Sequence, residues 1–140
     1  MLLTSRKIRK IKLNEDKFKG LSRPEIRQLV EQEVCDFYEV KLEMLRTKSR
    51  RRIYVMPRQL IMFLLEYYTE WSQLQIGSFY GGRDHTTVYH SRETIEDFLS
   101  HKTYTPVKEE LNNFLFKYGY RTLAAEQQEV KKAVAIDTYY

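Results

Sequence analysis

Apolar residues recur along most of the chain at the spacing of α-helices, and no segment alternates in the way that predicts a strand. The first such helix face comprises Ile26, Leu29, Val30, Val34 and Phe37. Ser22 followed by Pro24 is typical of a helix start and places the beginning of this helix there. The pattern therefore predicts an all-α protein whose first helix begins near residue 22.

The most apolar stretch lies near the middle of the sequence. Residues 60–68 are apolar almost all round, which predicts a helix buried on most sides, and Pro57 suits a first helical residue. We therefore expect a central helix that begins at Pro57 and is interrupted at 69–72. Three further helices are predicted: a short one ending at Gly81-Gly82, one from Asp84 to about His101, and one from Pro106 to Gly119.

These elements predict one folded domain with two tails. Residues 1–21 are basic and predict a flexible arm, and residues 22–119 form the domain. Residues 120–140 form a C-terminal tail that can become helical only if a neighbouring element covers it.

Charge points to a polyanionic partner. The chain has 24 Lys and Arg against 19 Asp and Glu, a net charge of +5, and no acidic residue lies between Arg46 and Arg58. The single Cys35 excludes an internal disulfide and cannot by itself form a zinc site, and no apolar run approaches the ~20 residues that span a bilayer. We expect a cytoplasmic protein without a cofactor, a bound metal or a membrane partner.

The helix that opens at Asp84 has two distinct faces at 100° per residue. Val88, Ile95, Phe98 and Leu99 share the side that we expect to face the core. The opposite side presents Arg83, Thr86, His90 and Thr94, with Thr87 at its edge. A short helix, a glycine turn and a polar-faced second helix together predict a helix-turn-helix whose second helix enters the major groove.

The run GGRDHTTVYHS from Gly81 to Ser91 resembles the C-terminal DNA-binding domain (domain IV) of the bacterial replication initiator DnaA. The resemblance extends to Pro57-Arg58-Gln59, to Ile76-Gly77 and to the basic loop after Leu45, and covers residues 22–118. It implies a compact Trp-repressor-like helical fold that binds double-stranded DNA at DnaA-box-like sites.

The resemblance also implies a role for individual residues. Asp84, His85 and Thr86 would contact bases in the major groove, and Arg50 would enter the adjacent minor groove. Contacts to the DNA backbone would come from Lys48, Arg58, Gln59, Arg83, Thr87 and His90. For Arg58 and Gln59 there is an independent argument, because free N–H groups at the start of a helix beginning at Pro57 would favour an anion.

The sequence departs from the family pattern in two respects. Glu93 and Thr94 stand where the family commonly carries a basic residue, which removes one phosphate contact. The ATP-binding motif GxxxxGK[ST] is absent, because no Gly in this sequence is followed by Lys. We therefore expect a stand-alone DNA binder, a monomer on DNA, that regulates replication initiation or transcription beside a separate initiator or ATPase.

Several alternatives remain open at the level of sequence. Asp84 could be only a helix cap, the run Arg50–Arg52 only a solvated face, and His90 either structural or phosphate-binding. A non-specific architectural nucleic-acid binder is the alternative function. A nuclease using Asp84, His85 and His90 is disfavoured, because His85 and His90 are not at the i, i+4 spacing that favours chelation. We expect no catalytic residues and no enzyme activity.

Overall fold

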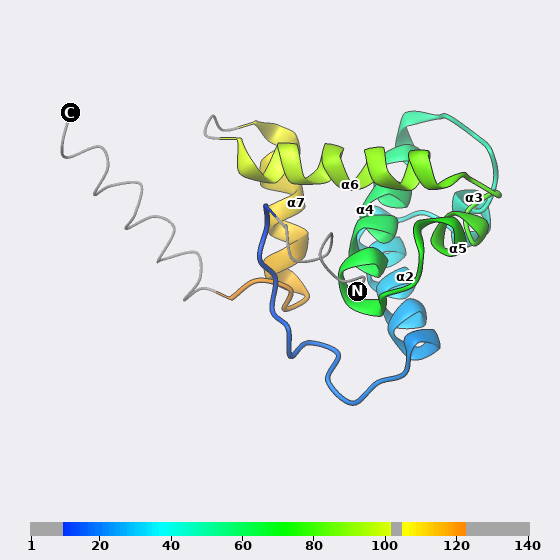
Figure 1. Ribbon diagram of the computed structural model, residues 1–140. Coiled ribbons are helices and arrows are strands. Elements are labelled where there is room, and N and C mark those ends of the chain that lie inside the picture. The colour runs from blue at the N-terminus through cyan, green and yellow to red at the C-terminus, as the bar shows by residue number, and fades with distance from the viewer. Residues whose placement is uncertain (1–9, 102–104, 123–140) are drawn as a thin grey trace.

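The computed structural model describes residues 10–101 and 105–122, and in those ranges it contains six helices and no strand. Helix α4 (Arg52–Thr69) is central, and α2 (Arg23–Tyr38) and α6 (His85–Ser100) both pack against it (Figure 1). The fold class predicted from the sequence, a compact all-α domain, is therefore confirmed.

The apolar stretch in α4 forms the centre of the core. All six side chains from Leu60 to Leu65 are buried, so this part of the helix has no solvent-exposed side. Neighbouring helices cover it on several sides, which is the arrangement that an apolar pattern all round a helix predicts.

The shorter helices are placed around α4. Helix α3 (Leu42–Leu45) lies against α4, α5 (Gln73–Ser78) lies against α4 and α6, and α7 (Pro106–Lys117) lies against α6. Side-chain hydroxyls cap the N-termini of α5 and α7: Ser72 accepts a hydrogen bond from the Gln75 N–H, and Thr105 accepts one from the Lys108 N–H. The predicted starts of α6 at Asp84 and α7 at Pro106 are confirmed.

Helix α4 begins earlier than the sequence predicts. Its first residue is Arg52, and the carbonyl of Arg51 accepts hydrogen bonds from the N–H groups of Tyr54 and Val55, so Pro57 lies inside the helix. The prediction of a helix starting at Pro57 was wrong. Proline deprives the carbonyl four residues back of its donor, here that of Ile53.

The N-terminal segment is part of the folded unit from residue 10 onwards, where the sequence predicts a flexible arm. Ile11, Leu13 and Phe18 are buried in the core. The hydroxyl of Tyr67 on α4 accepts a hydrogen bond from the Leu13 N–H at 2.9 Å, and Phe18 packs edge-on against Tyr68, with ring centroids 4.9 Å apart. The predicted arm is therefore corrected for residues 10–21. Long-range burial of three apolar side chains outweighs the local polar composition.

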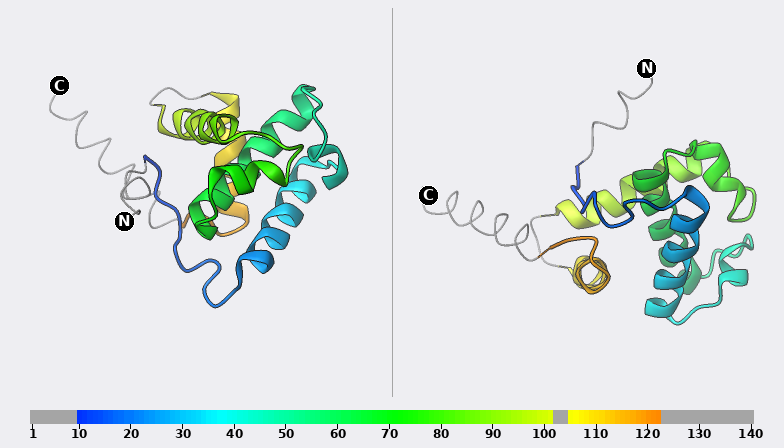
Figure 2. Two further views of the ribbon diagram at one scale, coloured as in Figure 1. Left: turned by 45° about the vertical axis from the view of Figure 1, so that its right-hand side comes forward. Right: turned by 90° about the horizontal axis from the view of Figure 1, so that it is seen from below.

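The C-terminal boundary is also displaced. Tyr120 is fully buried, its hydroxyl donates a hydrogen bond of 2.6 Å to Glu33 on α2, and its carbonyl accepts from the N–H of Asn14 at 2.7 Å. The N-terminal segment therefore runs beside the end of α7, as the blue and orange segments of Figure 2 show. From residue 123 onwards the predicted tail, with the helix that it can form, lies outside the described residues. Within the described part of the chain, no helix is long and apolar enough to cross a membrane.

Candidate nucleic-acid interface

The turn between α5 and α6 brings two backbone segments into direct contact. The N–H of Arg83 donates to the carbonyl of Gly77 at 2.9 Å. A Cβ at residue 77 would stand only 2.1 Å from the carbonyl oxygen of Arg83, so only glycine fits there. Gly81 and Gly82 follow with φ of +86° and +66°, the left-handed region that glycine adopts without steric cost. This backbone packing fixes the angle at which α6 leaves the turn.

Asp84 caps the first turn of α6. Its Oδ1 accepts hydrogen bonds from the Thr87 N–H at 2.8 Å and from the Thr87 hydroxyl at 3.0 Å. The bond from the Thr87 N–H, followed by that from the hydroxyl, lowers the pKa of Asp84 below its ordinary value. The predicted cap is confirmed. One carboxylate oxygen thus holds the helix, while the side chain as a whole stays exposed.

The side chains of α6 divide between core and solvent as the helical periodicity predicts. Val88, Ile95 and Leu99 are buried, and Phe98 is half-buried. Asp84, His85, Thr86 and His90 are exposed on the other side. Thr94 is half-buried there, and its hydroxyl donates to the carbonyl of His90 at 2.8 Å. The exposed face carries short polar groups that can form hydrogen bonds with base edges.

The segment from Arg46 to Arg51, which we call the basic loop, lies beside the start of α6. Arg46, Lys48, Arg50 and Arg51 are exposed. A nitrogen of Arg83, the residue before the α6 cap, donates to the Thr47 carbonyl at 3.1 Å. Burial, and then the nearby charge of Arg50, lower the pKa of Arg83. Figure 1 shows the loop, drawn in teal, curving back to the turn before α6.

Arg58 does not point to solvent, as a backbone contact to DNA would require. It is only 3% exposed, and its guanidinium donates to four carbonyls of the segment 44–49, which are described below. Burial, with a smaller contribution from Arg83, lowers its pKa to about 10. Arg58 is thus already engaged within the fold, and its predicted contact to the DNA backbone stays a prediction. Gln59, its neighbour in the same prediction, remains half-exposed.

A shallow hollow of about 260 Å³ separates the basic loop from α6. Arg50 borders it from the loop, Gln59 and Met62 from α4, and Arg83 and Thr87 from the turn and α6. Several of the predicted site residues, which are widely separated in the sequence, thus meet around one depression. Its rim carries guanidinium groups and no carboxylate among the described residues, which suits a polyanion.

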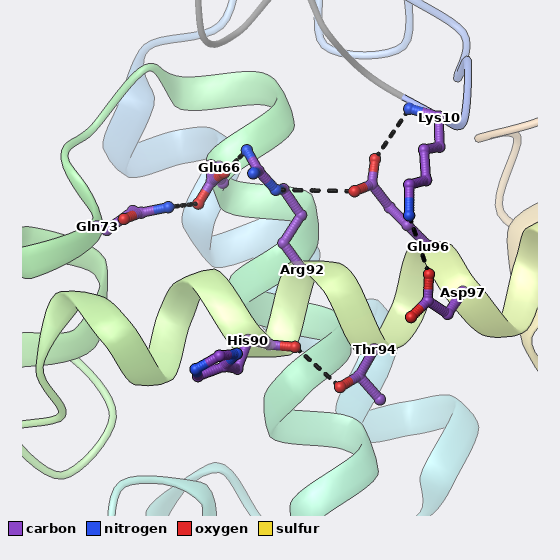
Figure 3. Close-up of polar contacts among 8 residues, drawn as sticks. All are labelled: Lys10, Glu66, Gln73, His90, Arg92, Thr94, Glu96 and Asp97. Carbon is purple, nitrogen blue, oxygen red and sulfur yellow. Dashed lines mark hydrogen bonds and ion pairs between the residues drawn. The ribbon is translucent and has the colours of Figure 1, made fainter.

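An ion-pair network on the opposite side of α6 holds the helix against α4. Arg92 pairs with Glu66 on α4 at 2.7 Å and with Glu96 at 3.7 Å, and Gln73 donates to Glu66 at 3.1 Å. Figure 3 shows Arg92 directed toward Glu66, while His90 and Thr94 lie on the other side of the helix. The sequence analysis missed this network. The i, i+4 spacing of Arg92 and Glu96 is a local signal for one pair, whereas nothing local indicates Glu66.

Lys10 extends this network to the N-terminal segment. Its N–H donates to Glu96 at 3.1 Å, and its ammonium group pairs with Asp97, also at 3.1 Å. Among the described residues, no group of three or more His, Cys, Asp or Glu side chains is placed to hold a metal ion.

The short helix α5, the glycine turn and the exposed polar face of α6 define a helix-turn-helix of the DNA-binding class. Residues 28–95 match the family described as bacterial dnaA protein helix-turn-helix, and this part of the chain resembles that family. The match runs from within α2 to within α6, so it contains the basic loop, α5, the glycine turn and α6 as far as Ile95. The resemblance stated from the sequence is confirmed.

Proposed function

We propose that this protein binds duplex DNA sequence-specifically at DnaA-box-like sites. The observation that carries the proposal is the attachment of the basic loop to the start of α6 through Arg83 and the Thr47 carbonyl. Because the loop and the helix are held side by side, one docking orientation brings α6 to the major groove and the loop to the neighbouring minor groove.

Within this proposal, base edges are contacted by the exposed first turn of α6. Asp84 accepts from a cytosine amino group through Oδ2, and His85 and Thr86 contact neighbouring bases. Arg50 enters the minor groove, where an AT-rich sequence narrows the groove and concentrates negative potential. The backbone contacts are Lys48, Gln59, Arg83, Thr87 and His90, which fix the register without reading sequence.

The proposed biological role is regulation of replication initiation or transcription, exercised as a monomer on DNA beside a separate initiator or ATPase. The proposed domain comprises the helices from α2 to α7 and the N-terminal segment from residue 10 that packs on them. The basic loop and α6 form its binding face. We also propose that it works without catalysis and without a cofactor, because the proposed role needs only the base contacts and phosphate contacts assigned above.

Selection of bound duplexes from a random pool tests the proposal. We expect a box related to the DnaA type to be enriched, and its affinity to fall linearly on a log–log plot of salt, by orders of magnitude from ~50 to ~200 mM. Competition with random-sequence duplex is the control. If random DNA competes as well as the selected duplex, the protein is a non-specific architectural binder, and the proposed specificity is wrong.

A further inference from the structure

Four of the five N–H groups of the Arg58 guanidinium donate to backbone carbonyls. Its Nε donates to Leu45 at 2.9 Å and its Nη1 to Ser49 at 3.0 Å. Its Nη2 donates to Thr47 at 3.3 Å and to Met44 at 3.4 Å. Met44 and Leu45 lie at the end of α3 and Thr47 and Ser49 lie in the basic loop, so one side chain of α4 holds both the end of α3 and the loop.

These bonds determine which groups the loop presents to solvent. Four carbonyls turn inward to Arg58, and the cationic side chains of Lys48, Arg50 and Arg51 are left exposed. No carboxylate pairs with Arg58 in the described ranges, so carbonyl dipoles alone compensate this buried charge. A planar guanidinium with several fixed N–H directions can bind such a set, whereas an ammonium group cannot.

Arg83 holds the same loop from the other side. The Thr47 carbonyl accepts from Arg83 Nη2 at 3.1 Å as well as from Arg58. Arg83 directly precedes the α6 cap Asp84. One carbonyl oxygen therefore joins α4, the basic loop and the start of α6, and the two like charges are tolerated because this oxygen lies between them.

We propose that Arg58 and Arg83 are positioning residues that fix the basic loop relative to α6 before DNA arrives. Arg58 then acts through Arg50, not by neutralising a phosphate. A loop that is already ordered loses less conformational freedom on binding, so these residues raise the affinity for the box through preorganisation. The inference rests on the proposed function, since it concerns how the same surface engages DNA.

A charge-conserving substitution separates the two roles of Arg58. Arg58→Lys keeps a cation for a phosphate but cannot bind four carbonyls, and Arg52→Lys is the matched control on an exposed arginine of the same helix. We expect Arg58→Lys to weaken box binding about tenfold or more, and Arg52→Lys to change it less than about twofold. Unchanged box binding by Arg58→Lys would show a simple charge contact and overturn the inference.

Coupling to Arg50 provides the second measurement. If Arg58 acts through the loop, Arg50→Ala should cost much less in the Arg58→Lys background than in the parent. Losses that simply add would show two independent contacts and contradict the proposal. Absence of any box preference in the parent protein would instead refute the proposed function, so the two failures are distinguishable.

Trypsin cleavage within residues 46–52 gives a readout that needs no DNA. We expect cleavage there to accelerate about tenfold in Arg58→Lys and to stay near the parent rate in Arg52→Lys. Thermal unfolding verifies that both variants fold. If Arg58→Lys does not fold, Arg83→Ala removes one of the two donors to the Thr47 carbonyl, together with the phosphate contact proposed for Arg83, and the same coupling to Arg50 is expected at smaller size. If the losses of box affinity in Arg83→Ala and Arg50→Ala simply add, or if trypsin cleaves residues 46–52 of Arg83→Ala at the parent rate, the inference is overturned.

Discussion

Gly81 in the turn before α6 lies directly against Thr47 in the basic loop. A Cβ at residue 81 would stand 2.9 Å from the Thr47 carbonyl oxygen and 3.2 Å from that of Arg46. The turn of the helix-turn-helix and the basic loop are therefore in backbone contact, in addition to the bond from Arg83 to the same carbonyl. Any side chain at position 81 must push the loop away from α6.

Two adjacent glycines make this contact testable. Gly81→Ala and Gly82→Ala both place alanine at positive φ, but a Cβ at residue 82 meets nothing within 4 Å. We expect Gly82→Ala to lower the free energy of unfolding by ~1 kcal/mol through backbone strain alone. Gly81→Ala should cost more and should also weaken binding to the box. Urea denaturation and fluorescence anisotropy measure both, and equal effects of the two variants would contradict the contact.

Base contacts and phosphate contacts should respond differently to substitution. His85→Ala and Thr86→Ala should cost ~1 to 3 kcal/mol on the box and leave binding to random DNA nearly unchanged. Lys48→Ala, on the exposed basic loop, should weaken both DNAs by similar factors and lower the salt slope by about one. Affinity measured on both duplexes at several salt concentrations checks this. A parent-like preference in the His85 and Thr86 variants would show that α6 does not contact the bases.

Arg50 should distinguish flanking sequences. Because we propose that it enters a narrow AT-rich minor groove, Arg50→Ala should weaken binding most for boxes with AT-rich flanks. Affinity for paired duplexes that differ only in the flank measures the effect. An equal loss on GC-substituted flanks would reduce Arg50 to a phosphate contact.

The Asp84 cap predicts a specific dependence of stability on pH. The hydrogen bonds from Thr87 favour the carboxylate and lower its pKa, so the cap contributes stability above the ordinary pKa near ~4. This contribution disappears as pH falls through the lowered pKa of the folded state. Asp84→Asn keeps a capping oxygen without the charge. The parent should therefore be more stable than Asp84→Asn by a larger margin at about pH 6 than at about pH 2. Midpoints of urea unfolding measured across that range test this. A constant difference would show that the carboxylate charge does not strengthen the cap.

The ion pair between Arg92 and Glu66 should contribute to stability, whereas the pair between Lys10 and Asp97 should not. The first is largely buried, with side chains 22% and 10% exposed, and the second is open to solvent at 55% and 59%. Arg92→Met removes the cation shared by two buried carboxylates and leaves them the hydrogen bonds from Gln73 and the Lys10 N–H, so it should cost ~1 to 3 kcal/mol after allowance for solvent screening. Lys10→Met should change stability little. Denaturant unfolding of both variants checks the contrast, and comparable losses would refute it.

Short-range patterns in the sequence determined much of the binding helix. Asp84 caps α6 by accepting a hydrogen bond from the N–H of Thr87, three residues later. Gly81 and Gly82 adopt the positive φ values of the turn, and the spacing of the apolar residues from Val88 to Leu99 sets the buried face. Each of these features depends on residues within a few turns of one another, so the order of side chains contains the information. The unbroken apolar run in α4 likewise determined that this helix would be buried.

Only the tertiary structure decided which groups Arg58 binds within the domain. The sequence marks it as a basic residue after a proline, in a setting where a phosphate contact is an ordinary expectation. Its partners are backbone carbonyls of Met44, Leu45, Thr47 and Ser49. Every residue has a carbonyl, so no side-chain pattern indicates which ones will converge on a guanidinium.

The burial of Ile11, Leu13 and Phe18, and the pairing of Arg92 with Glu66, have the same origin. Their partners lie far away in the sequence, on α4 and after α7, and are brought close only when the helices pack. The composition near the N-terminus is basic and polar, so by itself it predicts a mobile arm. Only the long-range contacts in the folded domain show that residues from 10 onwards are packed. The sequence by itself therefore determined the helices other than α3 and the start of α4, and the exposed face of α6, while packing between distant segments decided where the domain begins and how the basic loop is held.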